Sequence, residues 1–161
     1  MKKFTRTEYE VLLRYDFATF AGRCFQELNP QASLAVNWHL EVIAAKLTAV
    51  REGKIRRLII NLPPRHLKSL MASIAFPAWC LGHDPSAQLL CVSYGQDLAD
   101  KLARDCRSIM ISPWYQRIFP TRLAPHQAGG AGVHHHPPGI PARDLHRRRA
   151  DRTRRRHHRD R

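Results

Sequence analysis

The sequence predicts an α/β fold with a parallel sheet, preceded by helices and followed by a basic tail. Two short apolar runs, at 58–62 and 88–94, each lead into a stretch with helical spacing. That order is typical of parallel strands that alternate with helices. Apolar side chains at helical spacing also cover most of the first 54 residues. After about residue 120 large apolar side chains become rare, so we expect no core there.

Charge divides the chain at the same place. The 161 residues include 27 Lys+Arg and 13 Asp+Glu, which gives a formal net charge of +14. Residues 121–161 hold 11 of the arginines, only 3 acidic residues and 7 of the 10 histidines. Such a segment buries too little apolar surface to offset the entropy lost on ordering, so we expect a disordered tail over 126–161.

No membrane span or secretion signal is expected. No run approaches the roughly 20 apolar residues that a span requires, and the opening M-K-K-F leads into polar residues. The cysteines stand singly, without C-x-x-C spacing, which favours reduced, packed thiols in a cytosolic protein over a zinc site. They are Cys24, Cys80, Cys91 and Cys106.

Two helices are predicted ahead of the first strand, within an N-terminal segment that we assign to 1–54. The first covers 5–28 and ends before Pro30, because a residue that precedes proline avoids the helical region. The second covers 33–52, with Gly53 as its C-cap. One stripe of this second helix should be buried, and it consists of Leu34, Trp38, Val42, Ala45 and Ala49.

The predicted strand at 58–62 ends in a tight loop that brings Lys68 and Ser69 to the start of a helix. A helix start offers unpaired N–H groups and a partial positive charge, which suit phosphate. The usual pattern G-x-x-x-x-G-K-[ST] is broken twice, because Leu62 and Leu67 stand where glycines would be. On these residues alone, a phosphate site and an ordinary helix start both stay open.

The rest of the predicted body follows the same alternation. The helix after Ser69 should bend or end near Pro77, and a turn at 82–85 leads to the strand at 88–94. An amphipathic helix over 96–111 comes next, with apolar positions four residues apart or nearly so. Its Gln96 is expected to act as a helix-start residue.

Three stretches of this body resemble one family. I-I-N-L-P-P-R-H-L-K-S, then A-F-P-A-W-C-L-G-H-D-P, then C-V-S-Y-G-Q-D-L-A-D-K-L-A-R-D are similar to the N-terminal ATPase domain of phage terminase large subunits. The resemblance covers about 20–125 and is most specific over 56–120. It implies that 55–125 is part of a P-loop NTPase domain with a RecA/ASCE-like parallel sheet, left incomplete here.

The resemblance also implies roles for the loop residues. Pro64, Arg65, His66, Leu67, Lys68 and Ser69 would bind ATP, as the P-P-R-H-[GL]-K-S loop does in that family. Lys68 would hold the β- and γ-phosphates, Ser69 would bind Mg²⁺, and Arg65 would stabilise charge on the γ-phosphate. The segment 37–39 falls where related motors contact adenine, although burial of Trp38 on the helix stripe is the interpretation we favour.

Partners follow from the same resemblance. The family packages double-stranded DNA, together with a small terminase subunit and a portal protein, so this chain would act in the cytoplasm of a bacterial host as a prophage product. Its nuclease domain and the acidic residues that complete the ATPase are expected to be missing from this chain. Nucleotide binding is therefore expected without hydrolysis or DNA cleavage.

The tail itself is interpreted as out of frame. Read one base later, the codons for 139–161 are compatible with G-F-R-L-A-T-S-I-G-G-V-L-T-G-R-G-A-D-I-I-V-I-D, the kind of motif the family has at this place. We therefore expect a one-base slip between about 126 and 130. The predicted strands would then lack neighbours and leave exposed, aggregation-prone edges.

Two other function classes stay open. One is a nucleic-acid-binding accessory protein, in which the basic tail is the active part and binding weakens with salt. The other is a fragment of a helicase-like ATPase, which shares the loop chemistry. The P-P-R-H loop and the W-Y segment at 114–115 favour a terminase over a helicase.

Overall fold

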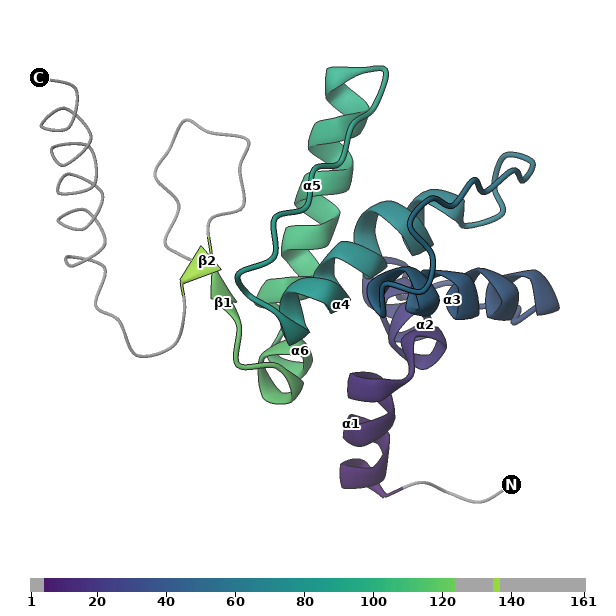
Figure 1. The fold of residues 1–161 in the computed structure, drawn as a ribbon. Coiled ribbons are helices and arrows are strands. Elements are labelled where there is room, and N and C mark those ends of the chain that lie inside the picture. Colours follow the sequence, from purple (N-terminus) through teal and green to yellow (C-terminus); the bar gives the residue numbers. More distant parts are fainter. Residues whose placement is uncertain (1–4, 124–134, 137–161) are drawn as a thin grey trace, which may run out of the picture.

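The computed structural model describes residues 5–123 and 135–136 (Figure 1). Helices make up most of this part of the chain, and they follow one another without an intervening sheet. In chain order the elements are α1 (Arg6–Tyr15), α2 (Phe17–Leu28), α3 (Trp38–Arg51), the π-helix η1 (Leu70–Ala75), α4 (Phe76–His83), α5 (Gln96–Ile111), α6 (Pro113–Ile118), β1 (Arg122–Leu123) and β2 (His135–His136).

The predicted α/β fold with a parallel sheet is wrong. The strands among the described residues are β1 and β2, an antiparallel pair in which Arg122 lies opposite His136 and Leu123 opposite His135. The predicted strands at 58–62 and 88–94 are not strands in the structure. A parallel strand needs a hydrogen-bonded neighbour on its edge, and no other segment within 5–123 offers one.

The predicted first helix is two helices, divided at Asp16. The backbone of Asp16 is extended (φ −104°, ψ 109°), which ends α1, and its carboxylate accepts a hydrogen bond of 2.8 Å from the Thr19 N–H, which caps α2. At the other end of α1, Thr5 and Glu8 form a capping box. Both helices therefore have their own start signal.

The predicted buried stripe of the next helix is also wrong. Helix α3 begins at Trp38, after Asn37 has capped it, and 72% of Trp38 is exposed. The interpretation of Trp38 as a core residue therefore fails. A competing stripe at helical spacing is buried instead, on the side of α3 that packs against α2 and η1. It consists of Leu40, Ile43, Ala44 and Leu47.

Pro77 does not break the helix that follows the loop. The chain is helical from Lys68 to His83, as a π-helical turn that passes into α4. The Phe76 N–H reaches back five residues to the Met71 carbonyl, and this wider turn makes room for a proline at the start of α4. The predicted helix over 96–111 is confirmed by α5.

The core lies where α2 packs against η1, α4, α5 and α6 (Figure 1). Phe20 is fully buried among aromatic rings, 5.5 Å from Trp114 and 5.9 Å from Phe119 between ring centroids. Polar groups fix the register: the Tyr115 hydroxyl donates to the Ala78 carbonyl at 2.8 Å, and the Thr121 hydroxyl donates to the Leu81 carbonyl at 2.8 Å. These contacts join α4 to the segment around α6.

Three cysteines are buried free thiols, and Cys91 is an exposed one, so the expectation of packed thiols fails at that position. Burial raises the pKa of Cys80 to about 11 and that of Cys106 to about 12, which keeps both protonated. In the part of the chain that the structure describes, no helix has both the length and the apolar character needed to cross a bilayer.

Candidate phosphate-binding loop

The candidate site is the loop at 63–69, between the segment 58–62 and the helix that begins at Lys68 (Figure 1). Leu58, Ile60 and Leu62 pack against the core on alternate positions, which anchors the chain on the side where the loop begins. Leu70 is buried on the side where the loop ends. The loop is thus held at both ends while its central residues face solvent.

The backbone of this loop is left-handed at two residues that are not glycine. Arg65 has φ +66° and Leu67 has φ +56°. Left-handed backbone costs a residue with a Cβ roughly 1–2 kcal/mol, and such conformations cluster at ligand sites. Leu67, counted above as a departure from the glycine pattern, takes the conformation that favours glycine. Successive turns of this kind aim backbone N–H groups into one concavity, which is a recurring way to bind anions.

The N–H groups of residues 65–70 make none of the hydrogen bonds found among residues 5–123. The first helical bond after the loop is donated by the Met71 N–H to the Leu67 carbonyl at 2.9 Å. Unpaired amides at a helix start attract anions, and the helix dipole adds to the effect. The loop therefore presents donors without protein acceptors.

Lys68 folds back over the loop. Its Nζ donates to the Leu62 carbonyl at 2.9 Å, so the lysine side chain reaches back to the residue that precedes the loop. His66 stabilises the same turn, because its Nδ1 lies 2.9 Å from the Pro64 carbonyl. Ser69 is exposed, and its side chain does not cap the helix. The loop thus brings together the lysine, the serine and the free amides that the sequence predicted.

One neighbour of the loop belongs to the segment 37–39, for which we favoured burial of Trp38 over a place near the nucleotide. The ring of His39, at the start of α3, lies 5.6 Å from the ring of His66, and Trp38 lies 6.3 Å from His39. His39 and His66 are 27 positions apart in the sequence. Gln96 stays apart as the first residue of α5, where its amide donates to Asp100 at 2.8 Å.

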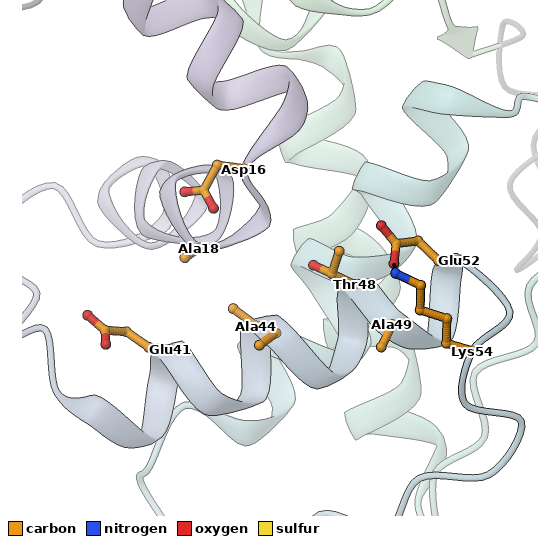
Figure 2. A pocket seen from close by; sticks show the side chains of 9 residues that line it. Asp16, Ala18, Glu41, Ala44, Thr48, Ala49, Glu52 and Lys54 are labelled. Carbon is orange, nitrogen blue, oxygen red and sulfur yellow. Dashed lines mark ion pairs between the residues drawn. The ribbon is translucent and has the colours of Figure 1, made fainter.

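Three acidic side chains line a groove that is separate from the loop. This groove of about 610 Å³ lies beside α3 (Figure 2), and its lining includes four alanines and the carboxylates of Asp16, Glu41 and Glu52. Glu52 is paired with Lys54 at 2.7 Å. Within the described ranges, no group of three or more His, Cys, Asp and Glu side chains is placed to hold a metal ion. The groove shares no residue with the loop, and its carboxylates disfavour phosphate.

The positive φ of Arg65 predicts that glycine is more stabilising than alanine at this position, which is the reverse of their order within a helix. Arg65→Gly should be about 1 kcal/mol more stable than Arg65→Ala, because only glycine adopts positive φ without cost. At Arg104, exposed within α5, the same comparison should favour alanine by about 1 kcal/mol, because glycine is a poor helix former. Urea unfolding of the four variants measures both differences. If the alanine variant were the more stable one at both positions, the backbone at Arg65 would not have the strained conformation described.

A scan against protein-family models, a search of curated proteins and a search of solved structures find no match to this chain.

Proposed function

We propose that this chain binds the phosphates of ATP, with Mg²⁺, in the loop at 64–69, and that it is the N-terminal ATPase part of a phage terminase large subunit. The left-handed backbone at Arg65 and Leu67 supports the proposal, because it occurs in the same loop as Lys68 and as backbone amides that lack protein acceptors. A strained, non-glycine loop of this form is retained most readily where it binds a ligand.

Each residue has a defined task in this proposal. Lys68 exchanges its neutral acceptor, the Leu62 carbonyl, for the β- and γ-phosphates, where a charge-assisted hydrogen bond is stronger. The amides from His66 to Ser69 complete the contacts to phosphate oxygens, and the Ser69 hydroxyl is a ligand for Mg²⁺. The Arg65 guanidinium, which belongs to an exposed residue of the loop, neutralises charge on the γ-phosphate.

We propose that the chain binds ATP and does not hydrolyse it. The acidic residues that orient Mg²⁺ and activate water in the family would lie after residue 130, where the reading frame is proposed to have slipped. Apart from His135 and His136, that tail lies outside the described residues, so the coding DNA tests this part. If the bases that encode 139–161 cannot be read as the expected motif in the neighbouring frame, the slip is excluded.

The same proposal places the chain in the cytoplasm of a bacterial host, as a prophage product. Double-stranded DNA, a small terminase subunit and a portal protein are the proposed partners of the intact motor.

Titration with MgATP tests the loop. Lys68→Ala should weaken binding about tenfold or more, because the variant loses a charge-assisted contact to phosphate. Lys46→Ala is the matched control: it removes the same charge from an exposed position of α3, away from the loop, and should leave the affinity unchanged. Equal affinities of wild type and Lys68→Ala would overturn the site.

A second function is favoured by charge alone. Residues 121–161 carry a formal net charge of +8, so a nucleic-acid-binding accessory protein would bind DNA through its tail. That function predicts salt-sensitive DNA binding that disappears on deletion of 127–161 and persists in Lys68→Ala. The two assays together separate the two functions.

A further inference from the structure

The most exposed large apolar side chains belong to two segments that are neither helix nor strand. Ile59 is 92% exposed, Leu90 90%, Val92 84% and Tyr94 99%, more than any other large apolar side chain in the described part of the chain. Soluble proteins rarely leave apolar residues bare at successive alternate positions. The segment 88–94, which leads into α5, exposes apolar side chains at three successive alternate positions, Leu90, Val92 and Tyr94.

The backbone of the same segment is also unpaired. No hydrogen bond among residues 5–123 uses a backbone N–H or carbonyl from 88 to 94, although bonds lie close on either side, from the Ala87 N–H to the Asp84 carbonyl and from the Ala99 N–H to the Gly95 carbonyl. An apolar segment with unpaired backbone groups is a template for pairing with another strand.

The sequence of the segment indicates which strand would pair with it. Q-L-L-C-V-S-Y has no charge, no proline and no glycine, and Cys91 is its midpoint. Antiparallel pairing of two copies about Cys91 sets Leu90 opposite Val92 and Leu89 opposite Ser93, so no like charges meet. The segment 58–62 is less suited, because Arg56 and Arg57 precede it and Arg65 follows it closely.

We infer that two copies of this chain associate through 88–94, as an antiparallel strand pair with Cys91 opposite Cys91. The pairing gives hydrogen-bond partners to the backbone groups on one edge of the segment and packs Leu90 of each copy against Val92 of the other. It joins two identical segments about a twofold axis, so it closes as a dimer. Because each copy carries a net charge of +14, added salt should strengthen the association.

Sedimentation of the full chain over a series of concentrations tests the dimer. Val92→Lys sets two charges into the paired strands and should weaken association about tenfold or more. Val36→Lys is the matched control, because Val36 is 71% exposed and lies outside the segment. Circular dichroism checks that each variant keeps its helices. A chain that stays monomeric, or one whose association Val92→Lys does not change, would overturn the proposal.

Disulfide formation tests the register. Opposite residues in antiparallel strands have Cα atoms about 4.5–5.5 Å apart, within the range of a disulfide. Partial burial raises the pKa of Cys91, so oxidation is run at about pH 9. Oxidised glutathione takes up two electrons and two protons from the two thiols and becomes two reduced glutathiones. A dimer linked by Cys91 and lost in Cys91→Ser is expected. Oxidation that yields no linked dimer, or links among other cysteines, would contradict the register.

Discussion

Phe20→Ala should lower the free energy of unfolding by about 4 kcal/mol. Phe20 is fully buried, and the rings of Trp114, Tyr115 and Phe119 surround it at centroid distances of 5.5, 6.2 and 5.9 Å. Removal of the ring forfeits its transfer free energy and leaves a cavity between α2 and α6 that large neighbouring rings fill poorly. Most small domains have only about 5–15 kcal/mol of stability, so this variant should be barely folded.

Urea unfolding followed by circular dichroism measures the loss. Trp38→Ala is the control, because it also removes an aromatic ring, but from a side chain that is 72% exposed. The control should change stability by less than about 0.5 kcal/mol. Similar losses for the two variants would mean that the core is not centred on Phe20.

Gly82→Ala should destabilise the protein by about 3 kcal/mol. A Cβ on Gly82 would lie 2.6–2.7 Å from three ring atoms of Phe119, which is far inside contact distance. Phe119 is itself buried, and its ring centroid lies 4.9 Å from that of Tyr115, so the Phe119 ring cannot move aside. The requirement for glycine here comes from the close approach of α4 to the end of α6.

The same substitution in α2 should have the opposite sign. A Cβ on Gly22 would meet Leu34 at 3.7 Å, an ordinary contact, and alanine is the better helix former. Gly22→Ala should therefore raise stability by about 0.5–1 kcal/mol. Thermal or urea unfolding of both variants measures whether Gly82→Ala lowers the stability and Gly22→Ala raises it. A stable Gly82→Ala variant would show that α4 and α6 do not approach each other as described.

Local signals predicted some elements well. Helix α5 was expected from the spacing of Leu98, Leu102, Cys106 and Ile109, and the structure buries Cys106 and Ile109 of that set. The division of 5–28 was missed, although Asp16 is a strong cap residue, because the apolar spacing continues across it. For α3, two stripes compete, and which one is buried depends on packing partners that are far away in sequence.

Non-local structure was predicted least well. The apolar runs at 58–62 and 88–94 have strand-like composition, but a sheet needs partners, and composition does not reveal whether the chain contains them. The loop was found through Lys68 and Ser69, whereas its left-handed turns at Arg65 and Leu67 were not, because neither residue type favours positive φ. Those turns come from the anchored ends of the loop, not from local preference.

The most direct test of the phosphate loop observes its backbone. Amide resonances of the full chain are followed while MgATP is added, with Mg²⁺ alone as the blank. We predict that the amides of 65–70 shift first and saturate together, and that those around the groove at Asp16 and Glu41 stay in place. If the loop amides remain unmoved while other amides saturate, or if no amide responds at millimolar MgATP, this loop is not a nucleotide site.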